Sequence, residues 1–229
     1  MKLLSNMKIA VIGTGRTGSA VVDLLGEQAI AFDKENKPAV EDLAPLDGAI
    51  IFVPGDSAAP VVETVLQSGI PAVWGTTGYA WPADLPERVK RAGGRWVIGS
   101  NFSLGMNIVR KCLETIGQSS SFLKNPSYHI HEVHHTGKKD APSGTALSWH
   151  EWLGTDAHIS SAREGDVKGI HELHVKTASE SIFLKHEAHS RSVFAEGAVW
   201  TMNYLLDNPF MKPGFYSFES IFDQVFTNK

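Results

Sequence analysis

The chain has 229 residues, of which 42% are hydrophobic, so it can bury the core of one large domain or two modest ones. Its formal net charge of −4 comes without a long lysine or arginine tract, which argues against nucleic acid and favours a small-molecule partner. A single cysteine excludes an intrachain disulfide, and with neither a signal peptide nor a membrane-spanning stretch a cytoplasmic protein is expected.

The first hundred residues alternate between short apolar runs and segments with helical spacing. Strands are predicted at Lys8–Ile12, Ala29–Phe32, Gly48–Val53, Pro71–Trp74 and Trp96–Ile98, and helices at Ser19–Leu25, Ala59–Gln67 and Ala83–Ala92. Such alternation is typical of a parallel sheet with helices on both faces.

The pattern changes after Asn101. Helices are predicted at Gly105–Ile116, Thr145–Leu153 and Gly197–Leu206, and strands at Tyr128–His134, Gly169–Thr177, Ser181–Ala188 and Phe194–Ala195. These elements indicate a second domain of the α+β type with a mixed sheet. The tail, Gly214–Thr227, is expected to return to the first domain.

A glycine-rich turn joins the first predicted strand to the first helix. It reads Gly13-Thr14-Gly15-Arg16-Thr17-Gly18, a pattern that lets the backbone approach a pyrophosphate at a helix N-terminus. Asp33 ends the second strand 33 − 13 = 20 residues later, where a carboxylate binds the adenosine ribose. Lys34 could meet a 2′-phosphate, so NADH and NADPH both remain open. A ligand-free turn is the alternative for the glycines alone.

A second loop, Gly75-Thr76-Thr77-Gly78, follows the strand Pro71–Trp74. Ligands of open parallel sheets bind at the carboxyl ends of the strands. Gly75, Thr76 and Thr77 are therefore candidate contacts of a nicotinamide, although an ordinary turn explains them equally well.

The segment from His131 to His135 matches the His-Glu-x-x-His pattern of zinc proteases. That pattern requires a helix, on which both histidines face one metal. The segment instead alternates like a strand, which would separate His131 and His135 by roughly 13 Å. We therefore predict no metal site and keep a zinc hydrolase only as an alternative.

The same segment supports proton and anion chemistry. His134, His135 and the nearby Lys138 can form a cationic cluster around a polar substrate. Ser143, Gly144 and Thr145 open the next predicted helix, where hydroxyl groups and unpaired N–H groups can hold a carboxylate.

The run from Glu132 to Ala146 resembles the signature of the dihydrodipicolinate reductase family, whose members are also called 4-hydroxy-tetrahydrodipicolinate reductases. Further segments resemble the family in the same order along the chain: Gly15–Gly18, Gly75–Gly78, Ser100–Asn107 and His189–Ala198. The resemblance implies an oxidoreductase of lysine (diaminopimelate) biosynthesis that transfers hydride from NADH or NADPH to a cyclic dicarboxylate. It also implies a homotetramer.

Carried onto this chain, the resemblance makes His134 the general acid or base and Lys138 the group that binds substrate and assists protonation. His135, Ser143, Gly144 and Thr145 would hold the substrate carboxylates. Ser100, Asn101 and Phe102 join the candidate cofactor contacts. A relative that still binds the cofactor but has lost its activity is the remaining alternative.

We therefore predict an α/β chain with two domains. Residues 1–101 and 206–229 would form a Rossmann-type dinucleotide-binding domain. Residues 102–205 would form the α+β domain that binds substrate and carries the contacts of the tetramer.

Overall fold

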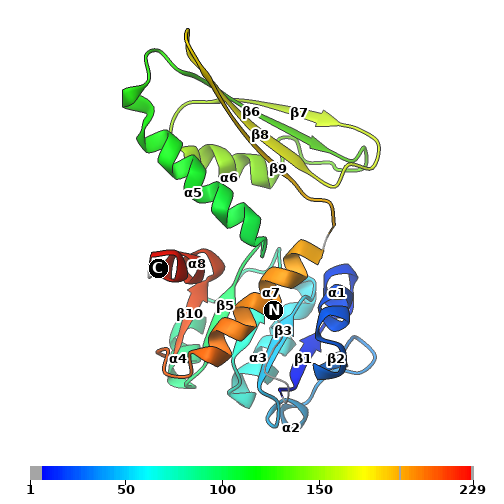
Figure 1. The fold of residues 1–229 in the computed structure, drawn as a ribbon. Helices are drawn as coiled ribbons and strands as arrows, with labels where there is room; N and C mark the ends of the chain where they lie inside the picture. The colour runs from blue at the N-terminus through cyan, green and yellow to red at the C-terminus, as the bar shows by residue number, and fades with distance from the viewer. Residues whose placement is uncertain (1–6, 191, 228–229) are drawn as a thin grey trace. The chain divides into compact units, whose positions relative to one another are not determined.

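The computed structural model describes residues 7–190 and 192–227, which divide into two compact units. The first unit holds a six-stranded sheet in the order β10-β5-β4-β3-β1-β2, and its paired strands all run parallel (Figure 1). The strands are β1 (Ile9–Ile12), β2 (Ala29–Phe32), β3 (Gly48–Ile51), β4 (Ala72–Trp74), β5 (Arg95–Ile98) and β10 (Gly214–Ser217).

Buried apolar runs explain the centre of this sheet. Every residue of β1, β3 and β4 is buried, as expected for parallel strands covered on both faces. The helices of the unit are α1 (Arg16–Leu25), α2 (Val40–Leu43), α3 (Ala58–Ser68), α4 (Leu85–Arg91), α7 (Ser192–Asp207) and α8 (Phe218–Thr227). Short 3-10 turns, η1 (Gly26–Gln28) and η2 (Gly55–Ser57), join them to the strands. The predicted Rossmann-type architecture of the first domain is confirmed.

The second unit, Leu104–Ser190, holds a mixed sheet in the order β7-β6-β8-β9. Its elements are α5 (Leu104–Gln118), η3 (Ser120–Phe122), β6 (Ser127–His134), α6 (Gly144–Leu153), β7 (His158–Arg163), β8 (Ile170–Lys176) and β9 (Ser181–Glu187). Strand β6 pairs parallel with β7 and antiparallel with β8. Both helices pack on the sheet face that carries Ile130 and Leu173, and Trp149 of α6 is fully buried there.

Several details differ from the sequence prediction. Strand β7 was not predicted, because its residues are half-buried or exposed and show no apolar alternation. Phe194 and Ala195, predicted as strand, lie inside α7. The first unit resumes at residue 192 rather than 206, because α7 packs against α1, β3 and β4. The predicted return of the tail is correct, since β10 pairs with β5.

Close packing explains why α7 belongs to the first unit. A Cβ atom on Gly197 of α7 would overlap the carbonyl oxygen of Phe102, so only glycine allows this approach. The ring of Phe102 in turn packs on Phe218 at a centroid distance of 4.7 Å.

Among the described residues, no helix is long and apolar enough to cross a membrane.

Candidate functional site

The glycine turn after β1 is shaped by two close approaches. Gly13 has a φ of +95°, and a Cβ atom on it would overlap the carbonyl group of Phe52. A Cβ atom on Gly18 would overlap the carbonyl oxygen of Gly13. Gly15 is the N-cap of α1 and has no side chain to bond the first-turn N–H groups. The first-turn N–H groups of α1 therefore receive no hydrogen bond from an N-cap side chain and can bind an anion.

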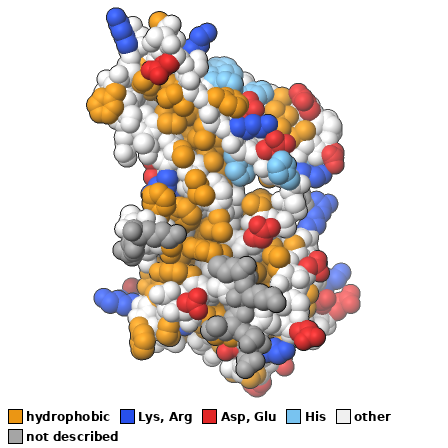
Figure 2. Space-filling view, in the orientation of Figure 1, with side chains coloured by type: hydrophobic (Ala, Val, Ile, Leu, Met, Phe, Trp, Pro, Cys, Tyr) orange, Lys and Arg blue, Asp and Glu red, His pale blue; other side chains and the backbone are white. Residues whose placement is uncertain are grey.

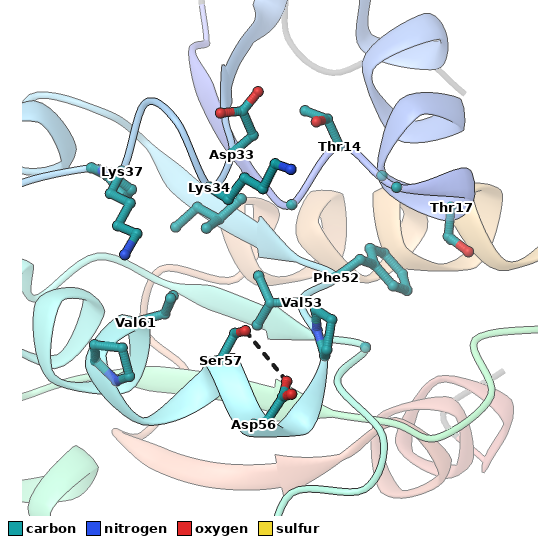
Figure 3. A pocket seen from close by; sticks show the side chains of 18 of the residues that line it. Thr14, Thr17, Asp33, Lys34, Lys37, Phe52, Val53, Asp56, Ser57 and Val61 are labelled. Atoms are coloured by element: carbon teal, nitrogen blue, oxygen red, sulfur yellow. Dashed lines mark hydrogen bonds between the residues drawn. The ribbon is translucent and has the colours of Figure 1, made fainter.

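A cavity of about 1060 Å³ opens over this turn, a size at the upper end of typical small-molecule sites. Figure 3 shows Asp33, Lys34 and Lys37 on one side of the cavity and Ser57 and Val61 on the other. It collects ten of the predicted cofactor residues: Gly13, Thr14, Gly15, Arg16, Thr17, Gly18, Asp33, Lys34, Gly75 and Thr77. The cradle left by the glycines and the volume above it both fit a dinucleotide.

The other predicted cofactor residues lie elsewhere in the first unit. Thr76 and Ser100 line a second cavity of about 340 Å³, which Thr77 also borders. The side-chain oxygen of Asn101 accepts the backbone N–H of Ser103 at 2.9 Å, and the side chain of Phe102 is buried. The structure therefore does not bring these residues into the larger cavity.

Asp33 organises the loop after β2. Its Oδ1 accepts the backbone N–H groups of Glu35 and Asn36 at 2.8 and 2.9 Å. The hydrogen bonds from Asn36 and Glu35 lower the pKa of the exposed Asp33 carboxyl, so it is ionised at neutral pH. Lys34 and Lys37 line the same cavity, and the charge of Lys34 also lowers the pKa of Asp33.

Phe52 is a cavity residue that the sequence analysis missed. A Cβ atom on Gly75 would overlap its ring, so the ring lies directly against the second loop. The ring also meets Phe102 edge-on, at a centroid distance of 6.2 Å. The only signal in the sequence was its position at the end of a predicted strand, the edge at which parallel sheets bind ligands.

The histidine segment lies on β6, the strand that the alternation predicted, up to His134, and His135 begins the loop that follows. His131 points to the outer face of the sheet, where its Nδ1 lies 2.7 Å from the hydroxyl of Ser160. His134 faces the other way, and its buried Nδ1 bonds to the carboxylate of Glu132. The segment is thus strand and loop, not the helix that the zinc-protease pattern requires.

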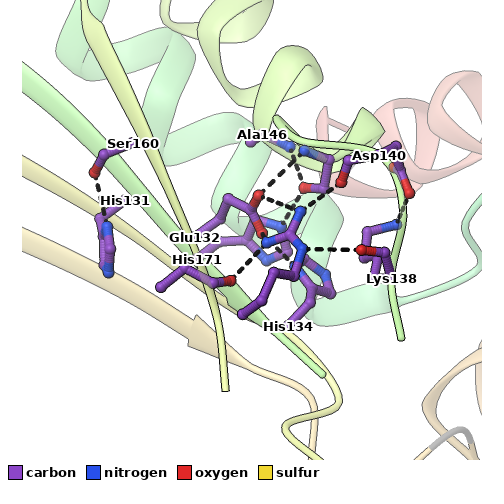
Figure 4. A network of polar contacts seen from close by, with 11 residues as sticks. His131, Glu132, His134, Lys138, Asp140, Ala146, Ser160 and His171 are labelled. Atoms are coloured by element: carbon purple, nitrogen blue, oxygen red, sulfur yellow. Dashed lines mark hydrogen bonds and ion pairs between the residues drawn. The ribbon is translucent and has the colours of Figure 1, made fainter. Parts of the chain in front are cut away.

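Glu132 is the centre of a buried polar network (Figure 4). It has no exposed surface, and its Oε1 and Oε2 lie 3.0 and 3.1 Å from the guanidinium of Arg163. Burial by itself raises the pKa of Glu132, but hydrogen bonds from Arg163, Ser161 and His134 outweigh it and lower the pKa to about 2. The carboxylate is therefore ionised throughout the working range of an enzyme.

Glu132, His134 and His171 also place one donor atom each within 4.8 Å of one another. Arg163 already bonds to both carboxylate oxygens of Glu132. A cation at this position would share the carboxylate with that guanidinium and lie close to its positive charge. The positive charge of Arg163 therefore disfavours a second cation at these three residues.

The residues predicted to hold a carboxylate lie at the start of α6. Ser143 is its N-cap, and its Oγ accepts the N–H of Ala146 at 3.2 Å. The backbone N–H of Ser143 donates to Oε1 of Glu132 at 3.3 Å, and its Oγ lies 3.2 Å from Nε2 of His171. Gly144 is exposed and Thr145 half-buried at the first turn of the helix. The structure thus joins the start of α6 to His134 through Glu132.

His171 is a buried partner that the sequence analysis did not single out. Burial is the main reason why the pKa of His171 falls to about 3, so its ring is neutral. The ring meets that of His134 edge-on at a centroid distance of 5.1 Å. A neutral imidazole adds no competing charge beside His134.

Lys138 lies in the loop after β6. Its Nζ bonds to Oδ1 of Asp140 at 2.8 Å, and its backbone N–H donates to the carbonyl of His135 at 3.0 Å. His135 is half-buried in the same loop. The guanidinium of Arg163 donates to the carbonyl oxygens of Lys138 and Asp140, so the loop is connected to Glu132 as well.

Comparisons with known proteins found relatives of one family. The family model described as dihydrodipicolinate reductase, C-terminus, matches residues 105–222. A 4-hydroxy-tetrahydrodipicolinate reductase of Christiangramia forsetii is 30% identical over 97% of this chain and 100% of the relative. One of Methanosarcina barkeri is 29% identical over 96% of this chain and 89% of the relative.

A solved structure shares the fold. The dipicolinate-bound dihydrodipicolinate reductase of Paenisporosarcina sp. TG-14 superposes with a TM-score of 0.73 and 16% identity, and the match covers 96% of this chain and 100% of that one. At this identity the likeness shows the fold alone.

Proposed function

The chain belongs to the dihydrodipicolinate reductase family, and from that premise we propose which of its residues carry out the reaction. The family activity is that of a 4-hydroxy-tetrahydrodipicolinate reductase, an NAD(P)H-dependent oxidoreductase of lysine and diaminopimelate biosynthesis. One observation carries this function most directly: the relative from Christiangramia forsetii matches along its whole length, not over one domain alone.

The cofactor is assigned to the cavity over the glycine turn. Its pyrophosphate would meet the free N–H groups at the start of α1, and the Asp33 carboxylate would accept the ribose hydroxyls. Lys34 and Lys37 supply positive charge beside the ribose position, which suits a 2′-phosphate. We therefore assign NADPH as well as NADH to this site. When bound, the dihydronicotinamide supplies the hydride.

Residues of the second unit are assigned to the substrate. A dicarboxylate has two anionic ends, and this unit offers a helix start at Ser143, Gly144 and Thr145 and a cation at Lys138. Nε2 of His134 is the ring nitrogen that does not bond to Glu132, so it is the atom that delivers the proton. His135 would bind a substrate carboxylate beside Lys138.

The assay that tests this function follows the near-ultraviolet absorbance of the reduced cofactor. The absorbance should fall only when 4-hydroxy-tetrahydrodipicolinate is present, and it should fall far more slowly with His134→Gln. Cofactor binding without any turnover would favour a relative that has lost its activity. Hydrolytic activity that requires added zinc and needs no nicotinamide cofactor would favour a zinc hydrolase.

We also propose that the chain forms a homotetramer through its second sheet. The face of this sheet away from α5 and α6 carries His129, His131, His174 and the exposed Phe183. Figure 2 shows histidine side chains at the surface over this unit. Measuring the mass of the protein in solution tests the proposal.

The cytoplasmic location expected from the sequence stays a prediction.

A further inference from the structure

We propose that Glu132 and Arg163 are positioning residues for the proton-transfer machinery: Glu132 orients and charges His134, and Arg163 ties Glu132 to the loop that carries Lys138. The roles of His134 and Lys138 rest on the proposed function. The arrangement of the four side chains does not, and it can be tested without substrate.

Glu132 decides which nitrogen of His134 is available. The two residues are separated by one position on β6, so their side chains share a face of the sheet. The Glu132 carboxylate accepts a hydrogen bond from Nδ1 of His134, which requires the proton of the neutral imidazole to sit on Nδ1. Nε2 then remains the only ring nitrogen able to exchange a proton with a substrate.

A glycine lies close to Nε2 of His134. Gly169 has a φ of +154°, and a Cβ atom on it would lie 3.1 Å from Nε2 of His134. A side chain at this position would crowd the atom assigned to proton delivery. Glycine at position 169 therefore keeps a side chain away from Nε2.

Glu132 also supplies the charge that His134 needs as an acid. Burial lowers the pKa of His134, and the cations Lys138 and Arg163 lower it further. The hydrogen bond and the charge of Glu132 act in the opposite direction. Glu132 is thus the neighbour that keeps the imidazolium form accessible in a buried position.

Arg163 connects this pair to the lysine. On the neighbouring strand β7 it stands opposite His134 in the parallel register. Its guanidinium reaches both oxygens of Glu132, at 3.0 and 3.1 Å, and donates to the carbonyl oxygen of Lys138 at 3.3 Å. One planar side chain therefore fixes the carboxylate behind the histidine and the backbone of the lysine.

A purely structural ion pair is the competing explanation. Such a pair would affect stability but leave the tautomer and the pKa of His134 unchanged. The experiment must therefore measure the tautomer and the pKa of His134 directly. A matched control exists on the same sheet, because the half-buried Glu172 pairs with exposed His174 at 3.4 Å, outside the proposed site.

The experiment is nitrogen-detected NMR of the full chain labelled on its histidine rings, titrated without substrate or cofactor. In the wild type, neutral His134 should carry its proton on Nδ1. In Glu132→Gln its pKa should fall by about one unit or more, because the carboxylate charge is lost while an acceptor remains. Glu172→Gln should leave His134 unchanged.

Turnover gives the second readout. If His134 is the acid, the high-pH limb of kcat should move to lower pH in Glu132→Gln, and turnover at neutral pH should fall at least about tenfold. The wild-type tautomer needs no variant, so a proton on Nε2 of neutral His134 would overturn the proposal even if Glu132→Gln fails to fold. An unchanged His134 pKa in folded Glu132→Gln would overturn it equally.

Different results would contradict the proposed function and the positioning role of Glu132. A wild-type protein that shows the Nδ1 tautomer but reduces no substrate would contradict the proposed function and leave the role of Glu132 intact. A protein that turns over normally while Glu132→Gln keeps the wild-type pH profile would contradict only the positioning role.

Discussion

Nη2 of Arg163 lies 3.0 Å from Oε1 of Glu132, a carboxylate that has no exposed surface. Removing one partner of a buried ion pair leaves the other charge without compensation, which typically costs roughly 3–5 kcal/mol. We expect Arg163→Met to lower the free energy of unfolding at neutral pH by about this amount, measured by urea denaturation.

The pH dependence of the same pair has a definite sign. The folded-state pKa of Glu132 is about 2, below its ordinary value of 4.5. Its contribution to stability is therefore complete above about pH 4.5 and is lost as the pH falls toward 2. The difference in stability between the wild type and Arg163→Met should shrink over this window. A difference that stays constant down to pH 2 would contradict the assignment.

The glycine turn offers a test that separates folding from binding. A Cβ atom on Gly18 would overlap the carbonyl of Gly13, whereas one on Gly15 would meet no atom within 4 Å. Gly18→Ala should therefore destabilise the first unit and weaken cofactor binding together. Gly15→Ala should keep the wild-type melting temperature and lose affinity for the cofactor, because its methyl group faces the proposed pyrophosphate. Equal affinity of Gly15→Ala and wild type, by fluorescence titration, would remove the pyrophosphate from this turn.

Asp33 can be tested without disturbing its loop. Asparagine keeps a side-chain oxygen for the N–H groups of Glu35 and Asn36, which Oδ1 accepts at 2.8 and 2.9 Å. Asp33→Asn should therefore weaken NADH binding, by about tenfold, through the loss of the charged ribose contact. NADPH should lose less, because Lys34 and Lys37 also line the cavity. Equal losses for both cofactors, by titration calorimetry, would contradict the ribose assignment.

Two neighbouring lysines provide a matched pair in the loop after β6. Lys138 is half-buried and bonds to Asp140 at 2.8 Å, whereas Lys139 is exposed. Lys138→Ala should lower turnover by about a hundredfold or more, since it removes a group that binds substrate and assists protonation. Lys139→Ala should behave like the wild type in the same steady-state assay. Similar losses in both variants would point to a general effect of loop charge.

The sequence was informative wherever the signal was local. Gly13 and Gly18 are close to each other along the chain, and their spacing alone predicted a turn whose crowding the structure confirms. The strand Tyr128–His134 was also readable, because its side chains alternate in polarity and burial. Both features depend only on residues that are neighbours in sequence.

The contacts around Glu132 could not be predicted from residues that are neighbours in sequence. Arg163 reaches Glu132 because β7 pairs with β6, and β7 is a polar strand without apolar alternation. His171 stands opposite Glu132 in the antiparallel register of β6 and β8. Such partners are set by strand pairing between distant segments, which a single sequence does not specify. Because strand β7 was not predicted, Arg163 was not recognised as a partner of Glu132.

The reduction itself is tested most directly by following the hydride. The protein would be incubated with 4-hydroxy-tetrahydrodipicolinate and reduced nicotinamide cofactor deuterated at the hydride-bearing carbon, and the product would be examined by mass spectrometry. The account predicts tetrahydrodipicolinate carrying one deuterium from the cofactor, and far less of it with His134→Gln. Product without deuterium, or no product with cofactor bound, would contradict the account.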